Sequence, residues 1–158
     1  MFYKHITKPY IVRLLFGVAL YIVYVSMSDI YPLLPPLIGI LFVIFHKFNN
    51  LQQTYIPIFI VFCIFFYELD KSLIIGIIPC VFFIVHIFVA QQLESLLHVN
   101  SFFIIVYVVA LYLFYLAGMI LCNILLNTPV LEFSFIYVYY MIIDSILALV
   151  YYFIFIRD

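Results

Sequence analysis

Residues 101–126 read SFFIIVYVVALYLFYLAGMILCNILL, a stretch that contains no charged side chain. A helix needs about 20 mainly apolar residues to cross the hydrocarbon core of a bilayer, and this stretch is long enough. Over the whole chain of 158 residues, 70% are hydrophobic and 8% are charged. Soluble domains usually carry about 25% charged residues. The composition therefore predicts an integral membrane protein.

The charged residues mark the limits of further apolar segments. Every Lys, Arg, Asp and Glu except Asp144 lies at the end of an apolar run or in a short gap between runs. Runs such as 74–78 (IIGII) lack the alternation that a membrane β-barrel requires. We therefore predict an all-α, six-helix transmembrane bundle with short loops and a single domain. The expected spans are residues 11–27, 32–46, 54–68, 72–91, 101–126 and 131–156.

Prolines and short runs indicate departures from regular spans. The prolines of 32–36 place the start of the second segment in the headgroup layer, and Pro79 predicts a bend or local opening in the fourth. The second and third segments are short for a bilayer. Such lengths are compatible with membrane thinning, re-entry or burial against neighbouring helices.

The distribution of basic residues predicts the orientation. Cytoplasmic loops of membrane proteins carry an excess of Lys and Arg. In the six-span arrangement only Lys71 falls on the side opposite the termini. The basic residues on the side of the termini are Lys4, Lys8, Arg13, Lys47 and Arg157. We therefore expect a multi-pass protein of the bacterial inner membrane with both termini in the cytoplasm.

Four acids fall on the predicted outer side, namely Asp29, Glu68, Asp70 and Glu132. One interpretation is that they only signal the topology. The other is that they form a docking surface for a cationic segment of a partner.

Asp144 is the charged residue inside an apolar run. An ionised carboxylate near the bilayer centre costs at least about 2.5 kcal/mol, so it must face the bundle interior, be protonated or have a partner. Tyr140 lies one helical turn earlier and is placed to donate a hydrogen bond to it. Asp144 is either a packing contact between helices or part of a proton or cation relay. His86 and Asn123 are the other polar residues that such a relay would use.

Two histidines and three cysteines are candidate ligands. His46 and His86 could bind one haem axially, as in membrane cytochromes, or His86 could be a neutral histidine between helices. Phenylalanines crowd His86, and no small-residue surface for a porphyrin adjoins it. Cys63, Cys80 and Cys122 lack metal-ligand spacing and read as buried thiols. We expect no metal and no cofactor.

Signatures of soluble enzymes and of nucleic-acid-binding proteins do not occur in the sequence. It contains no G-x-S-x-G, no phosphate-binding glycine loop and no H-E-x-x-H. All four glycines lie in expected spans, and no basic patch suits a nucleic acid. We therefore expect no catalytic residue and no enzymatic activity.

Three features together carry a resemblance to a known family. A proline, an apolar span and a basic turn follow one another in 36–47 (PLIGILFVIFHK). Glu68, at the end of the third span, is followed by Gly76, and Asp144 is a polar residue in the middle of the last span. In order and spacing, residues 32–156 resemble the family of the rod-shape-determining protein MreD. Members are short multi-pass proteins of the bacterial inner membrane with very small loops.

The resemblance implies a non-enzymatic scaffold in cell-shape control and peptidoglycan synthesis. MreD-like proteins partner MreC and act with the MreB filament and a penicillin-binding transpeptidase. By this resemblance, the single span of an MreC-like partner packs in a groove between helices. Glu68 and Asp70 would orient the periplasmic part of the partner, Asp144 would lock internal packing, and Gly76 would be a structural glycine.

The sequence is also compatible with two other functions. The substrate-binding subunits of vitamin transporters have a similar architecture. The chain could therefore be a small-molecule transporter subunit, either a vitamin-binding module or a proton-coupled carrier. Asp144, His86 and the tyrosines near Asp144 would then line its pocket. A haem- or quinone-linked subunit of a redox complex is the third alternative.

Overall fold

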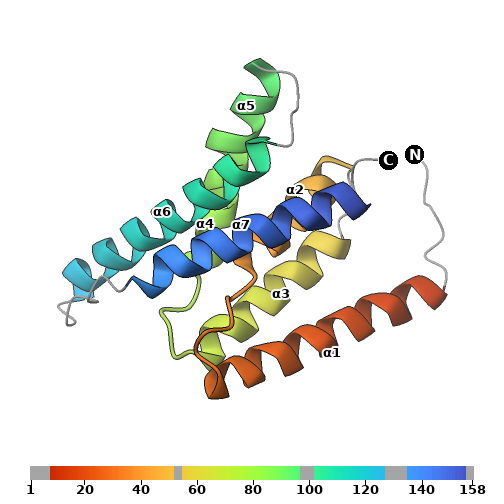
Figure 1. Cartoon of the computed structure of the whole chain (residues 1–158), viewed down its shortest axis with the longest axis horizontal. Helices are drawn as coiled ribbons and strands as arrows, with labels where there is room; N and C mark the ends of the chain where they lie inside the picture. The colour runs from red at the N-terminus through yellow and green to blue at the C-terminus, as the bar shows by residue number, and fades with distance from the viewer. Residues whose placement is uncertain (1–7, 52–54, 97–101, 127–134, 156–158) are drawn as a thin grey trace.

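The computed structural model of the chain describes residues 8–51, 55–96, 102–126 and 135–155. Helices account for most of these residues, and no strand occurs among them (Figure 1). The helices are α1 (Lys8–Ile30), α2 (Ile38–Asn50), α3 (Tyr55–Asp70), α4 (Ile77–Ile84), α5 (Gln91–Leu96), α6 (Phe102–Leu126) and α7 (Ile136–Phe155). A π-helical segment, η1 (Val85–Ala90), joins α4 to α5.

Three helical segments of the described chain are long and apolar enough to cross a membrane. They are Ile77–Glu94, Phe102–Leu126 and Ile136–Ile154. α1 contains a shorter apolar stretch, Leu14–Ile30. α2 and α3 have 13 and 16 residues. At a rise of about 1.5 Å per residue both are shorter than the roughly 30 Å of a hydrocarbon core. The all-helical prediction is confirmed, whereas helix length and composition identify only three clear spans.

The second expected segment becomes helical later than residue 32. α2 begins at Ile38, after Leu37 in a left-handed conformation with φ 56°. Prolines in the preceding loop have carbonyl acceptors but no N–H donors, so the loop depends on donors from elsewhere. Three tyrosine hydroxyls donate to its carbonyls: Tyr21 to Pro36 at 3.3 Å, Tyr24 to Pro35 at 2.7 Å, and Tyr140 to Pro32. The loop is thereby fastened to α1 and α7.

The fourth expected segment departs from regular geometry at η1. Pro79 lies in the first turn of α4, where a missing N–H removes no intrahelical hydrogen bond. The helix widens instead into the π-helical turn of η1, six residues further along the chain. The local opening of the fourth segment therefore lies at η1 and not at Pro79. Wide turns of this kind re-aim side chains and are frequent at functional sites.

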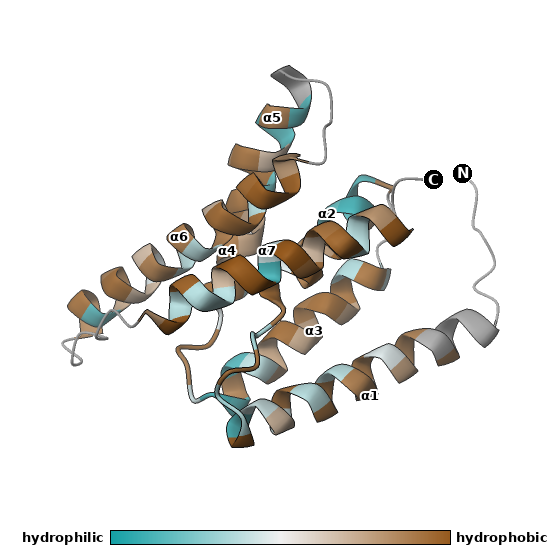
Figure 2. Cartoon of the chain, viewed as in Figure 1, coloured by the Kyte–Doolittle hydropathy of each residue, from teal (hydrophilic) through white to brown (hydrophobic). Residues whose placement is uncertain are grey.

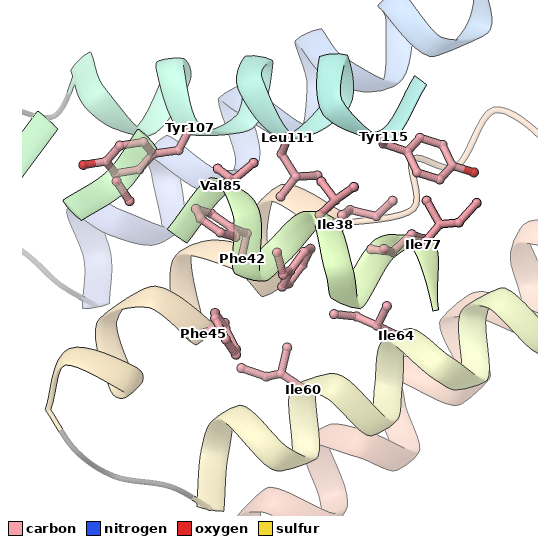
Figure 3. Close-up of a cluster of buried hydrophobic side chains, with 14 of the residues drawn as sticks. Ile38, Phe42, Phe45, Ile60, Ile64, Ile77, Val85, Tyr107, Leu111 and Tyr115 are labelled. Carbon is pink, nitrogen blue, oxygen red and sulfur yellow. The ribbon is translucent and has the colours of Figure 1, made fainter. Parts of the chain in front are cut away.

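The short helices α2 and α4 form the centre of the bundle. α2 packs against α3, α6 and α7, and α4 packs against α3 and α6, whereas α1 lies against α3 (Figure 1). Apolar side chains from these helices meet in one buried cluster (Figure 3). It includes Ile38, Phe42 and Phe45 of α2, Ile60 and Ile64 of α3, Ile77 of α4, Val85 of η1 and Leu111 of α6.

Hydrophilic residues gather at two opposite ends of the bundle (Figure 2). At one end, the last turns of α1 and α3 meet through an ion pair between Asp29 and Lys71. At the other, the last turn of α2 meets α5 through His46 and Glu94. The start of α1 and the end of α7 both lie on the right of Figure 1. We call the end with the Asp29–Lys71 pair the α3 end, and the end with the His46–Glu94 contact the α5 end.

Candidate functional site

Asp144 caps the start of α2 from the middle of α7. The carboxylate is fully buried. Its Oδ2 accepts a hydrogen bond from the backbone N–H of Gly39 at 2.6 Å and another from the Tyr112 hydroxyl at 3.1 Å. Gly39 lies in the first turn of α2, where N–H groups have no intrahelical partner and a negative charge is favourable. Asp144 thus joins α7, α2 and α6 at one point.

Gly39 makes this junction sterically feasible. A Cβ at this position would lie 2.8 Å from Cγ2 of Val108 and 3.0 Å from Oδ2 of Asp144. The absence of a side chain therefore lets the backbone of α2 approach α6 and α7 closely. The sequence does not mark this glycine, because its importance comes from residues on other helices.

Tyr140 is not the hydrogen-bond partner of Asp144. It donates to the carbonyl of Pro32, and Tyr112 of α6 bonds the carboxylate instead. The expectation failed because helical spacing identifies neighbours on the same helix only. Asn123 is buried near the end of α6 and is not among the groups that bond Asp144 or His86.

Glu68 performs a similar role for α4. Its side chain is fully buried. Oε2 accepts the N–H of Gly76 at 2.7 Å, and Oε1 accepts the N–H of Ile78 at 2.7 Å. The carboxylate predicted to face a partner is therefore inside the fold, because α4 begins directly after the turn and its first N–H groups need acceptors. The contact also gives a physical reason for the spacing of Glu68 and Gly76.

Gly76 adopts a left-handed conformation with φ 95°. A Cβ there would meet nothing within 4 Å, so alanine would introduce backbone strain and no clash. We expect Gly76→Ala to lower the free energy of unfolding by about 1–3 kcal/mol. The measurement is unfolding in mixed micelles, with Gly17→Ala as control. Gly17 also has open space around it but is helical, so alanine there should be neutral or slightly stabilising. Equal effects at both glycines would contradict the prediction.

The α3 end carries a small ionic cluster. Lys71 pairs with Asp29 and lies 3.7 Å from Oδ2 of Asp70. Asp29 follows the first expected span, and its hydrogen bond from Lys71 lowers the pKa of the carboxyl group. Lys71 therefore neutralises part of the negative charge on the surface that was expected to bind a cationic segment of a partner. Asp70 keeps a side chain that is 19% exposed.

A cavity of about 360 Å³ opens beside this cluster, between the proline-containing loop and helices α3, α6 and α7. We call it the tyrosine cavity, because five tyrosines line it. They are Tyr67, Tyr112, Tyr115, Tyr137 and Tyr140. Through Tyr112 its wall connects to Asp144. Phenol rings and hydroxyls together can contact both the apolar and the polar parts of a small ligand.

His46 and His86 form a hydrogen-bonded chain at the α5 end. His46 Nε2 lies 2.7 Å from Oε1 of Glu94, and the two Nδ1 atoms lie 2.8 Å apart. The Asn49 amide nitrogen lies 2.8 Å from His86 Nε2. The Glu94 carboxylate only accepts, so Nε2 of His46 donates to it. The two Nδ1 atoms share the second hydrogen bond of the chain, and the amide of Asn49 bonds Nε2 of His86. All four ring nitrogens of the two histidines therefore have a hydrogen-bond partner.

This arrangement does not fit an axial haem. Two ligands on opposite sides of one iron need nitrogens about 4 Å apart, because each metal–nitrogen bond is about 2 Å long. The two Nδ1 atoms contact each other directly at 2.8 Å, and the two Nε2 atoms are bonded to Glu94 and Asn49. Among the described residues no group of three or more His, Cys, Asp and Glu has the arrangement of a metal site.

The histidine chain was only partly foreseen from the sequence. The sequence pairs His46 with His86 as possible ligands, whereas Glu94 was not among the residues singled out. In fact it extends the same helical segment by about two turns beyond His86. Residues separated by two turns share a face of a helix. Continuing the helical periodicity beyond His86 would therefore have predicted Glu94 on the same helix face.

Comparisons with known proteins do not assign the chain to a family. A scan against models of protein families found no match, and searches of curated proteins and of solved structures found none either. The functional proposal therefore rests on the residues and on the geometry described above.

Proposed function

We propose that this chain is a non-enzymatic scaffold in the bacterial inner membrane, similar in role to MreD. Its partner would be a single-span protein of the MreC type, and its activity would be to help organise cell-wall elongation. The deeply buried carboxylates support a structural protein. The carboxylates of Asp144 and Glu68 each accept hydrogen bonds from the first N–H groups of a helix. Moving either carboxylate away would leave buried N–H donors without an acceptor.

The observation that carries the proposal is the uncovered surface of α7. Only 17% of its apolar segment is buried, against 39% for α6 and 44% for Ile77–Glu94. Its exposed apolar side chains follow helical spacing and form a continuous stripe, the α7 stripe. The stripe consists of Val138, Ile142, Ile146, Val150 and Phe153. A straight row of this kind offers ridges and grooves against which a second helix can pack in a bilayer.

Two contacts support the proposed orientation. The Asp29–Lys71 pair brings the ends of α1 and α3 together, and the His46–Glu94 contact brings the end of α2 to α5. The last turn of α2, which contains Lys47, lies on the side of the bundle where α1 starts and α7 finishes, and Lys71 follows the end of α3 on the other side (Figure 1). With both termini cytoplasmic, this arrangement agrees with the excess of Lys and Arg expected on the inside.

The α7 stripe predicts which substitution weakens partner binding. Ile146 is 54% exposed at the middle of the stripe. We expect Ile146→Trp to reduce co-purification of an MreC-like protein from the same organism by about tenfold, because a bulky ring separates the packed helices. The control is Phe16→Trp on α1, where Phe16 is 64% exposed but lies outside the stripe. If Phe16→Trp lost the partner and Ile146→Trp retained it, the α7 stripe would not be the interface.

The tyrosine cavity favours a second candidate, a small-molecule transporter subunit. Its volume of about 360 Å³ falls within the range of ligand sites. A proton-coupled carrier would use Asp144 by changing its protonation, so Asp144→Asn would abolish uptake. A scaffold would retain partner binding in the same variant, since the amide oxygen still accepts from Gly39 and Tyr112. Measuring uptake and partner capture on one preparation separates the two functions.

A further inference from the structure

A second cavity, of about 290 Å³, lies at the α5 end of the bundle. The C-terminal half of α2, the start of α6, α5 and the end of α7 enclose it. We call it the α5 cavity. It is separate from the α7 stripe and from the tyrosine cavity, and the scaffold proposal does not use it.

In the part of the chain that the structure describes, the Tyr107 hydroxyl is an unpaired polar group in the wall of the α5 cavity. Tyr107 lines the cavity and is only 5% exposed. Its hydroxyl is buried and has no hydrogen-bond partner within the part of the chain that the structure describes. Figure 3 shows the hydroxyl directed away from the apolar cluster, at one end of it. A buried hydroxyl without a partner is unfavourable, so a polar atom of a ligand would stabilise this position.

Charges of both signs line the same cavity. Glu94 is held there by His46 at 2.7 Å and by the amide of Asn50 at 3.3 Å, and its side chain remains 30% exposed. A carboxylate has acceptor sites for more than these two bonds. Lys47 also lines the cavity. His46 also faces the cavity, and its Nε2 is engaged by Glu94.

The remaining walls suit an amphipathic molecule. The rings of Phe103, Tyr107 and Tyr152 line the cavity, and aromatic faces attract ammonium groups. Leu51, at the rim, is 55% exposed and gives the opening an apolar edge. The cavity lies at the ends of α2 and α7, where the headgroup layer would be if the chain spans a membrane as proposed above.

We propose that the α5 cavity binds the headgroup of a zwitterionic phospholipid that carries a primary ammonium, as in phosphatidylethanolamine. The ammonium donates to Glu94 and to the Tyr107 hydroxyl, the phosphate lies near Lys47, and the acyl chains leave over Leu51. Phosphatidylglycerol lacks the ammonium. The quaternary ammonium of phosphatidylcholine has no N–H to donate.

The test uses the purified full chain, stripped of lipid in detergent. Phosphatidylethanolamine, phosphatidylcholine or phosphatidylglycerol with identical acyl chains is then added. Saturating phosphatidylethanolamine should raise Tm by about 3–6 °C, and the other two lipids by less than half as much. Soluble glycerophosphoethanolamine should have little effect, because it lacks the acyl chains. Equal stabilisation by all three lipids, or by the soluble headgroup, would overturn the proposal.

Substitutions tie the effect to the α5 cavity. Tyr107→Phe removes a single oxygen atom and should reduce retention of phosphatidylethanolamine in native mass spectrometry by about tenfold. Glu94→Gln should abolish the preference over phosphatidylcholine. Tyr115→Phe, on the same helix but in the tyrosine cavity, should behave as wild type. Unchanged retention in Tyr107→Phe would refute the assignment. Partner capture is scored separately, so failure of the scaffold proposal would be recognised independently.

Discussion

Replacing Asp144 by alanine is expected to lower the free energy of unfolding by about 3–5 kcal/mol, since it leaves two buried donors unpaired and opens a cavity. The donors are the N–H of Gly39 and the hydroxyl of Tyr112. Asp144→Asn retains an oxygen that can accept both bonds, so we expect a loss of about 1–2 kcal/mol. Unfolding in mixed micelles, followed by circular dichroism, provides the measurement.

The neighbouring Ser145 supplies the control for this series. Within the described ranges its hydroxyl bonds the carbonyl of Met141 on the same helix, so Ser145→Ala should cost less than about 1 kcal/mol. If asparagine at position 144 destabilised the protein as much as alanine, the charge itself would be essential. The capping role would then be wrong.

The second large effect is expected at Glu68. Glu68→Ala should lower the free energy of unfolding by about 3–5 kcal/mol, because the N–H groups of Gly76 and Ile78 lose their acceptors inside the fold. Glu68→Gln keeps one acceptor oxygen, and we expect about half of that loss.

Asp70 is the matched control for Glu68. It lies two residues further along α3, is partly exposed, and its ionic contact with Lys71 is 3.7 Å long. A pair with so long a contact and partly exposed side chains contributes at most about 1 kcal/mol, so Asp70→Ala should be nearly silent in unfolding. A larger loss from Asp70→Ala than from Glu68→Ala would contradict the structure. Should Glu68→Ala leave stability unchanged but abolish partner capture, Glu68 would be the docking residue first expected from the sequence.

The two caps follow from the architecture of the bundle. α2 begins after a proline-containing loop, and α4 begins after a turn with a left-handed glycine. Both helix starts are buried among longer helices, where water cannot satisfy their first N–H groups. A carboxylate on a neighbouring helix is an effective solution, since it accepts more than one bond and complements the helix dipole. Burial of Glu68 and Asp144 is therefore a requirement of short central helices.

The sequence predicted the helical class well because apolar runs and charged gaps are local features. It could also place α6 within one residue at its start, since 101–126 has no internal interruption. The start of α2 was harder to predict. Its loop depends on hydroxyls of Tyr21, Tyr24 and Tyr140, two of which lie on α1 and one on α7.

Contacts among the site residues were even harder to predict from the sequence, because they join different helices. Gly39 and Asp144 are 105 residues apart, and His46 and His86 are 40 apart. Helical periodicity relates residues within a few turns and carries no information about contacts between helices. The sequence therefore identified Asp144, Glu68 and His86 as unusual, whereas only the fold revealed what each side chain bonds.

Photocrosslinking in intact cells is the measurement that tests the scaffold proposal most directly. A photoreactive benzoylphenylalanine would replace Ile146 on the α7 stripe, and Phe16 on α1 in a parallel sample. The account predicts that position 146 crosslinks to a single-span MreC-like protein and that position 16 does not. If position 146 yields no protein adduct while the MreC-like protein is present in the same membrane, the α7 stripe is not its docking surface and the scaffold proposal fails.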